Sequence, residues 1–416
     1  MKNCFLLLLI FVGTAAHAQR LNENLFLPAE GQKHLVRIDG SGYFLSGDLK
    51  KEFTDKFIHG GFIDSTLKSD VRNDLKKENR AGAEIEYGIS YYNYGKQIFG
   101  RPDWSWFAGI SSHEFYNGSF SKDLFSLVFF GNREFAGKTA ELAPLHFNSI
   151  SFSKLSWGVF SKSTQSSISL SLVAGHQFSS LETSKADLYT AADGSALALT
   201  LNENYYRSDS SATSGIALNG WGAATDMVFN FNTGKNRSVK LNQSFRLTLR
   251  NFGFIRWNSS SLYQHKDSSY SYTGFEVNNL LNGVSDPFAS TNLQDTLGIR
   301  YEQKMVTQFL PFTFSLEATT ITFTEKKIQP FYGVRLRANA NYKPMIHLGM
   351  QYNPKEHIAL SLYGAFGGYG GFRAGINANA KIGQHLQLGI YTGNVTGWFL
   401  KKSYGMDLGI NLMAAF

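Results

Sequence analysis

The sequence predicts an all-β protein, an antiparallel transmembrane β-barrel of about 14 strands (range roughly 12–18) with a short helix in its long loops. Three observations predict this fold. Apolar and polar residues alternate with a period of two along many segments, which only a β-strand presents as two distinct faces. The chain has 35 Phe, 20 Tyr and 40 Gly, yet its mean hydropathy is only −0.20. It also ends on an alternating strand, Tyr404–Phe416, whose last residue is aromatic.

The N-terminus predicts export. A basic start, Met1–Asn3, precedes an apolar run, Phe5–Val12, that is too short to span a bilayer. Ala16-His17-Ala18 then matches the small-x-small cleavage pattern, so we expect a signal peptide over 1–18 and one mature barrel domain over 19–416. The only cysteine, Cys4, leaves with the signal, which excludes disulfides and thiol chemistry from the mature chain.

Composition narrows the function classes. No later apolar stretch is long enough for a transmembrane helix. The formal net charge of +8 is spread over a long chain without a Lys/Arg run, so a nucleic-acid partner is not expected.

The N-terminal half predicts strands that are less regular. Residues 68–80 are charged and favour a loop helix, and residues 179–224 are typical of a long exposed loop with one short hairpin. We expect strands near 41–53, 81–94, 103–112, 124–132, 146–160, 166–178, 225–232 and 239–250.

The C-terminal part predicts seven strands from Phe312 onward, joined mostly by short connections. Together with the eight expected before them this makes fifteen, and single-chain bacterial barrels prefer even numbers, so we expect 14 or 16. A soluble β-sandwich is the alternative. Alternating strands of about ten residues favour the barrel, because sandwich strands average about five or six.

Residues 266–310 form the largest piece without alternation and are expected to be a loop or hatch segment. Phe275–Gly283 within it favours a short helix closed by glycine. If Phe416 lies on the periplasmic side, strand parity places this segment on the outer side, where long barrel loops are usual.

No catalytic signature is present. Gly367–Gly371 is glycine-rich but joins two strands, so it is interpreted as a hairpin loop and not a phosphate-binding loop. The ten histidines are scattered and show no strand spacing that brings two together. We therefore predict no enzyme activity, no cofactor and no metal site.

Charged residues on the non-lipid face are the one constellation with a functional meaning. A charge facing lipid near the midplane would cost roughly 2–4 kcal/mol, so alternation assigns these residues to the lumen. One interpretation is an anion-attracting pore or a polar ligand site; the other, which we favour, is an internal salt-bridge network that fills a narrow barrel. The candidate lumen-lining residues are Arg246, Arg250, Glu317, Arg335, Arg337, Arg373, Lys381 and Asp407.

The chain resembles a Bacteroidota family of exported outer-membrane β-barrels of unknown function. The resemblance rests on Asn251–Trp257 (N-F-G-F-I-R-W), on Tyr272–Glu276 (Y-T-G-F-E) and on the glycine-rich C-terminal hairpins. Such barrels are distantly similar to long-chain fatty-acid transporters and to barrels of the gliding and type IX secretion apparatus. The resemblance implies the location and the fold, and it supplies no catalytic or ligand residues.

Two functional hypotheses follow for a non-enzymatic barrel of the cell outer membrane. The first is passive transport or binding of a small solute or apolar molecule in the lumen. The second is a structural or partner-docking barrel in a surface secretion, gliding or adhesion assembly. The expected partners are outer-membrane lipids, a small ligand or secretion-complex protein, and the barrel-assembly machinery, for which Phe416 is the candidate assembly signal.

Overall fold

The computed structural model describes residues 31–209, 217–232, 244–273, 300–319 and 328–416. The predicted signal peptide and the predicted helix at Phe275–Gly283 lie outside these residues. Within the described residues, no helix combines the length and the apolar character needed to cross a membrane.

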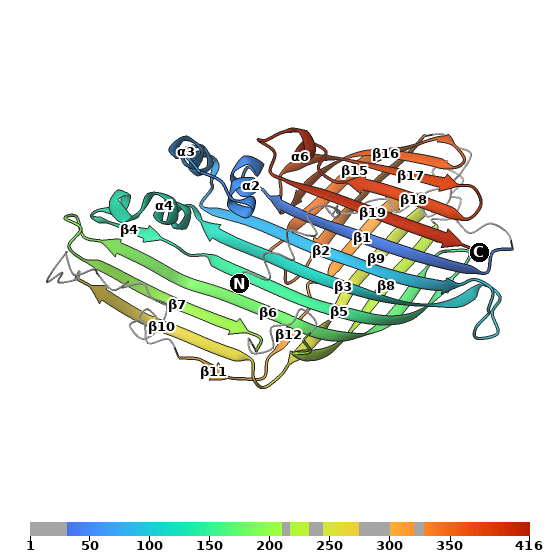
Figure 1. The fold of residues 1–416 in the computed structure, drawn as a ribbon, viewed down its shortest axis with the longest axis horizontal. Coiled ribbons are helices and arrows are strands. Elements are labelled where there is room, and N and C mark those ends of the chain that lie inside the picture. Colours follow the sequence, from blue (N-terminus) through green and yellow to red (C-terminus); the bar gives the residue numbers. More distant parts are fainter. Residues whose placement is uncertain (1–30, 210–216, 233–243, 274–299, 320–327) are drawn as a thin grey trace.

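Fourteen antiparallel strands form a closed ring (Figure 1), which confirms the predicted fold class. The ring closes where the first strand pairs with the last, with Leu35 opposite Ala415. In order around the ring the strands are β1 (His34–Ser46), β2 (Glu78–Asn93), β3 (Trp104–Ser121), β5 (Leu145–Ser161), β6 (Ser167–Thr190), β8 (Gly220–Asn232), β9 (Ser244–Trp257), β13 (Thr313–Thr319), β14 (Ile328–Arg337), β15 (Lys343–Lys355), β16 (Ile358–Gly368), β17 (Phe372–Ile382), β18 (Leu386–Thr392) and β19 (Gly405–Ala415).

On one side of the barrel the wall continues past the ring. The first half of β6 pairs with β8, whereas its second half, from Ser179 to Thr190, pairs with β7. β7 then pairs with β10, which carries the extension further from the ring (Figure 1). The extension consists of β4 (Lys138–Glu141), β7 (Leu197–Arg207), β10 (Leu262–Tyr272) and β11 (Glu302–Gln303), and β12 (Thr307–Phe309) links it to the ring.

The two ends of the barrel differ. At one end, named here the Phe416 end, the carbonyl of Phe416 accepts hydrogen bonds from the backbone amides of Lys33 and His34, both at 2.9 Å. The opposite end, named here the helix end, carries the long connections (Figure 1). These contain α2 (Lys51–His59), α3 (Ser65–Asp74), α4 (Lys122–Phe130), the 3-10 helix η1 (Asn132–Phe135) and α6 (Thr396–Phe399).

The outer surface of the ring is an apolar belt. Along β15, Ile346, Leu348 and Met350 are exposed, whereas the residues between them are buried in the interior. β19 follows the same alternation, because Asp407 and Asn411 are buried between apolar neighbours. Exposed large aromatics lie toward both ends of the strands, as expected for membrane interfaces, for example Trp221, Phe366 and Phe372 at the helix end and Phe231 and Tyr352 at the Phe416 end.

The predicted strand at 124–132 is wrong, because residues 122–130 form the helix α4. Ser121 caps this helix, since its hydroxyl accepts a hydrogen bond from the backbone amide of Leu124 at 3.0 Å. The segment is apolar without a period of two, so it packs one side against α2 and α3 instead of spanning the belt. Removing it from the fifteen expected strands leaves the fourteen of the ring.

The predicted exposed loop at 179–224 is also wrong over much of its length. β6 continues to Thr190 and forms a long hairpin with β7. Burial in this part does not follow a period of two, because a register shift between Thr183 and Lys185 interrupts the pairing with β7, so it lacks the alternation that marks the other strands. The predicted loop at 266–310 contains the end of β10 and the short strands β11 and β12. The helix expected at 68–80 is shorter, since α3 ends at Asp74 and β2 begins at Glu78.

Candidate functional site

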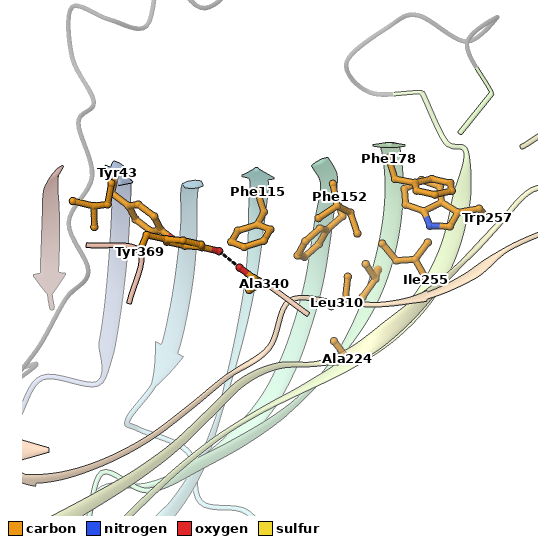
Figure 2. Close-up of a cluster of buried hydrophobic side chains, with 13 residues drawn as sticks. Tyr43, Phe115, Phe152, Phe178, Ala224, Ile255, Trp257, Leu310, Ala340 and Tyr369 are labelled. Atoms are coloured by element: carbon orange, nitrogen blue, oxygen red, sulfur yellow. Dashed lines mark hydrogen bonds between the residues drawn. The ribbon is translucent and has the colours of Figure 1, made fainter. Parts of the chain in front are cut away.

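A layer of buried apolar side chains crosses the barrel interior near the helix end, and it is named here the apolar layer (Figure 2). Most of its members come from the strands β1, β3, β5, β6, β8 and β9 on one side of the ring. The others come from three connections on the other side: before β13, between β14 and β15, and between β16 and β17. Trp257 is fully buried and its ring stacks on Phe178 with centroids 4.5 Å apart. The layer consists of Tyr43, Leu45, Phe115, Ile150, Phe152, Val173, Phe178, Ala224, Ile255, Trp257, Leu310, Ala340 and Tyr369.

Arg337 spans the interior at this level. Its guanidinium donates to the carboxylate of Glu84 at 2.6 Å and to the hydroxyl of Tyr43. The same group lies 5.0 Å from the ring centroid of Phe115 and donates through Nε to the hydroxyl of Thr313 at 3.1 Å. The side chains of Arg337 and Glu84 are only 11% and 12% exposed, so water screens this ion pair weakly.

Tyr369 holds two turns of the helix end inside the barrel. Its hydroxyl donates to the carbonyl of Ala340, in the turn between β14 and β15 (Figure 2). Its ring lies against Gly82 of β2, where an added Cβ would stand only 2.2 Å from ring atom Cε2. Tyr342 packs edge-on against the same ring, with centroids 5.1 Å apart. Glycine is therefore required at position 82 for the turn between β16 and β17, which carries Tyr369, to enter the interior.

Polar contacts fill the interior on the Phe416 side of the apolar layer. Lys154 of β5 donates to Asp226 of β8 at 2.7 Å and to the side chain of Asn251 at 2.6 Å. The backbone amide of Asn251 also donates to Asp226, at 2.6 Å. Arg335 pairs with Glu317 at 3.5 Å, and both side chains are almost fully covered. Charges in this region therefore have partners within the wall.

The structure places the predicted lumen-lining residues on the buried faces of their strands or at half-buried positions there, but it does not gather them into one site. Arg246 donates through Nε to Asn230 at 2.9 Å, and Arg373 lies 2.6 Å from the sulfur of Met345. Arg250 and Lys381 are half-buried. The remaining predicted residues are Glu317, Arg335 and Arg337, described above, and Asp407.

Asp407 organises a loop instead of pairing with an arginine. Its carboxylate accepts hydrogen bonds from the hydroxyl of Thr392 at 2.8 Å and from the backbone amides of Gly393 and Asn394 at 2.8 and 2.7 Å. Phe416 is 60% exposed and its ring lies 5.5 Å from that of His34.

The prediction misses several charged residues of the interior, among them Glu84, Glu86, Lys154 and Asp226. The alternation of Glu84 and Glu86 on β2 is a signal that puts both on one face, but nothing in the sequence shows which residues face them across the barrel. Ligand atoms of Glu84, Glu86 and His113 lie within 4.8 Å of one another, an arrangement that could hold a cation. However, Glu84 already binds Arg337, whose positive charge disfavours a cation there.

A cavity of about 650 Å³ lies on the helix-end side of the apolar layer, between the extended wall and the turn after β14. Phe178 of the apolar layer, Tyr206 and Val306 supply apolar walls. Asn117 Nδ2, Gln308 Oε1 and Asn341 Nδ2 belong to residues lining this cavity, and these atoms have no hydrogen-bond partner among the described residues. The other lining residues are His146, Phe147, Asn148, Ser180, Leu181, Glu182, Lys304, Met305, Thr307, Phe309, Asn339 and Ala340.

Electrostatics at the helix end is dominated by local ion pairs. Lys50, just before α2, bonds to the Asp74 carboxylate at 2.6 Å. This hydrogen bond raises the pKa of the Lys50 ammonium above its usual range, against the opposing effect of partial burial. Such exposed pairs contribute little to stability, but they neutralise most of the lysines around α2 and α3.

Comparisons with known proteins address the family and the fold. The family of unknown function DUF5723 matches residues 153–391. No curated protein matches the chain significantly. Among solved structures, the toluene transporter TodX of Pseudomonas putida is 10% identical, with 97% of this chain and 96% of that chain covered and a TM-score of 0.38. The translocator domain of the autotransporter NalP from Neisseria meningitidis is 6% identical, with 93% and 90% covered and a TM-score of 0.31. Similarities this distant carry no argument about function.

Proposed function

We propose a function for this chain, which belongs to the family of unknown function DUF5723, from the geometry of its barrel interior. The protein is a non-enzymatic outer-membrane barrel that binds a small molecule in the cavity at the helix end. The ligand has an apolar or aromatic body and several hydrogen-bonding groups. The observation that carries the proposal is the cavity itself, with three amide side chains whose hydrogen-bonding capacity is incompletely used.

The cavity matches the requirements of a small-molecule site. Its volume of about 650 Å³ lies within the range of about 300–1,000 Å³ that is common for ligand pockets. Asn117, Gln308 and Asn341 bring amide groups to the lining, and one amide atom of each has no partner among the described residues, so these side chains keep hydrogen-bonding capacity for a ligand. Phe178 and Tyr206 offer flat apolar faces beside them.

The closed interior favours binding, or passage that requires a rearrangement, over free diffusion through a pore. The apolar layer lies directly below the cavity, and Arg337, Tyr369 and the turn at Ala340 cross from the far wall. The charges below the layer are largely paired within the wall, which supports the internal-network interpretation over an anion-attracting pore.

The proposed orientation puts the helix end outside the cell and Phe416 in the periplasm. The concentration of long connections and helices at the helix end supports this orientation, because the long loops of outer-membrane barrels lie on the outer side. The apolar belt around the ring supports the membrane placement itself. The signal peptide, the reading of Phe416 by the barrel-assembly machinery and the Bacteroidota origin stay predictions, as does the similarity to fatty-acid transporters.

The experiment measures binding to the protein in lipid nanodiscs by calorimetry, with phenyl β-glucoside, phenol and glucose as probes. Phenyl glucoside combines an aromatic body with hydroxyl groups, so we expect it to bind about tenfold tighter than phenol or glucose alone. A tenfold difference in affinity corresponds to the net free energy of one or two hydrogen bonds. Ser180→Trp fills the cavity from β6 and should abolish binding, whereas Ser271→Trp, on an exposed face of β10, should not. Equal binding by both variants would place the ligand elsewhere.

A second candidate function is docking of a protein partner at the helix end, as in a surface assembly. It is favoured by exposed apolar side chains on and near the helices: Phe57, Phe62 and Val128 are 67%, 83% and 64% exposed. Gentle detergent extraction should then recover a stoichiometric partner with the native protein and lose it with Phe57→Ser and Phe62→Ser combined. Recovery that is equal for both proteins would argue against docking at these residues.

A further inference from the structure

A second hollow lies on the outside of the barrel, on the apolar belt between β14 and β19, and it is named here the belt groove. It has a volume of about 790 Å³, and most of its lining side chains point away from the interior. Leu362, Met350 and Ile390 among them are 63%, 63% and 47% exposed. The side chains of α6 form its limit at the helix end, and Ile328 and Tyr352 lie toward the Phe416 end.

A small side chain on β17 opens the groove. On the outward face of this strand the groove is lined by Ala378, which is too short to fill the space between its neighbours, and by Ile376. Ala378 pairs with Leu360 on one side and with Ile390 on the other, and both of these side chains project into the membrane region. The result is a hollow in the outer surface of the barrel wall, with larger side chains on both sides of Ala378.

The limit at the helix end is rigidly held. Trp398 of α6 donates its indole N–H to the carbonyl of Asp407 at 3.1 Å and to the hydroxyl of Thr392 at 3.3 Å. Gly397 lies so close to β19 that an added Cβ would stand 2.3 Å from the carbonyl oxygen of Gly405. The groove is therefore formed in advance of binding, which reduces the entropy cost of holding a flexible chain.

Two cations stand at the same end of the groove. Lys401 and Lys402 follow directly after the exposed Phe399 and Leu400, and both lysines are exposed. Within the described part of the chain neither lysine has a carboxylate within ion-pair distance, although Lys50 and Lys51 nearby are paired with Asp74 and Asp55. An aromatic–lysine pair at the edge of an apolar belt is typical of the membrane interface, where anionic lipid headgroups lie.

We propose that the belt groove binds one anionic, phosphate-bearing membrane lipid of the leaflet that surrounds the helix end. An acyl chain lies over Ala378 and Ile376 of β17, and the phosphate lies at Lys401 and Lys402. Charge complementarity identifies this occupant, because a second copy of the chain would bring the same two lysines or an apolar belt to the site. The inference is independent of the cavity inside the barrel.

The experiment uses the delipidated full-length protein in mixed micelles and measures retained lipid by native mass spectrometry. The probes are phosphatidylglycerol and phosphatidylcholine with identical acyl chains, and glycerol 3-phosphate. We expect phosphatidylglycerol to be retained about thirtyfold more than phosphatidylcholine, as for two lysines near an anionic headgroup. Glycerol 3-phosphate should not be retained, because it lacks the chain. Equal retention of the two lipids, or retention of glycerol 3-phosphate alone, would overturn the proposal.

Variants separate the two halves of the site. Lys401→Gln with Lys402→Gln should remove the preference for phosphatidylglycerol, whereas Lys355→Gln, an exposed lysine at the Phe416 end, should keep it. Ala378→Trp should abolish retention of both lipids, whereas Ala108→Trp on the outward face of β3 should not. If Ala378→Trp instead converted a dimer into a monomer, the occupant would be a second copy and the proposal would be wrong. An unchanged thermal unfolding midpoint of Ala378→Trp in detergent would show that this variant folds.

Discussion

Arg337 on β14 binds Glu84 on β2 across the interior of the barrel, with Nη2 and Oε2 2.6 Å apart. These strands are seven steps apart in either direction around the ring of fourteen, so the ion pair joins opposite walls. The barrel is therefore braced through its centre as well as hydrogen-bonded around its circumference.

Loss of this brace should destabilise the barrel. Arg337→Ala leaves the Glu84 carboxylate covered and unpaired, which typically costs about 3–5 kcal/mol. Replacing both residues, as Arg337→Leu with Glu84→Leu, should recover much of the loss because no buried charge remains. Urea unfolding in vesicles, followed by tryptophan fluorescence, measures both changes. A loss below about 1 kcal/mol for Arg337→Ala would mean that the pair behaves like a solvated surface pair.

A side chain at Gly82 should expel Tyr369 from the interior. Gly82→Val places a Cβ about 2.2 Å from the Tyr369 ring, so we expect a loss of about 1–3 kcal/mol from overpacking. Gly40→Val on the neighbouring strand β1 is the matched control, because a Cβ there meets nothing within 4 Å. Thermal unfolding in detergent compares the two variants. Equal midpoints would show that the Tyr369 contact does not hold the turn inside.

A charge on the apolar belt should cost stability only if that belt faces lipid. Leu172 of β6 is 63% exposed, and Leu172→Arg should lower the free energy of unfolding from a bilayer by roughly 2–4 kcal/mol. Leu218→Arg is the control, since Leu218 is 47% exposed in the connection between β7 and β8. The measurement is the folded fraction in vesicles across a urea series. An unchanged folded fraction for Leu172→Arg across the urea series would contradict the membrane assignment.

Asp407→Asn should loosen the loop that carries α6. The amide keeps one acceptor oxygen, so at least one of the hydrogen bonds from Thr392, Gly393 and Asn394 is lost. A charge-assisted bond of about 1.5 kcal/mol corresponds to about tenfold more frequent opening. Trypsin cleavage after Lys401 and Lys402 should accelerate accordingly. Asp267→Asn, on an exposed face of β10, is the control: trypsin should cleave this variant after Lys401 and Lys402 at the native rate. Equal cleavage rates for the two variants would contradict the role of Asp407.

The C-terminal strands were predictable because each has two different environments. On β19 the exposed Ile410 and the buried Asp407 and Asn411 face lipid and interior, and this contrast is written directly into the sequence as alternation. Where this contrast is interrupted, the sequence signal disappears. In the second half of β6 a register shift between Thr183 and Lys185 breaks the alternation, and α4 is apolar without a period of two.

The contacts across the interior could not be predicted. Alternation puts Arg337 and Glu84 inside, but which residues meet depends on the strand number, the register and the turns that fold inward. Asp407 illustrates the limit: its buried position follows from the pattern, whereas its donors are the last residue of β18, Thr392, and two backbone amides of the connection that follows, which no periodicity describes. The cavity depends likewise on the segment at 304–309 and the turn near Asn341.

Thiol labelling tests the central claim, an outer cavity above a closed interior, most directly. The chain has one cysteine, so a Cys4→Ser background allows single cysteines on β6. Ser180 lines the cavity and Ser169 is buried beyond the apolar layer on the same strand. The protein is placed in proteoliposomes, and a charged methanethiosulfonate reagent is added to the outside. Trypsin, also added outside, cleaves after Lys401 only in molecules whose helix end faces outward, which identifies them. We predict that Ser180→Cys reacts and that Ser169→Cys reacts only after denaturation. Equal reaction of both in the folded protein would show an open lumen and contradict the account.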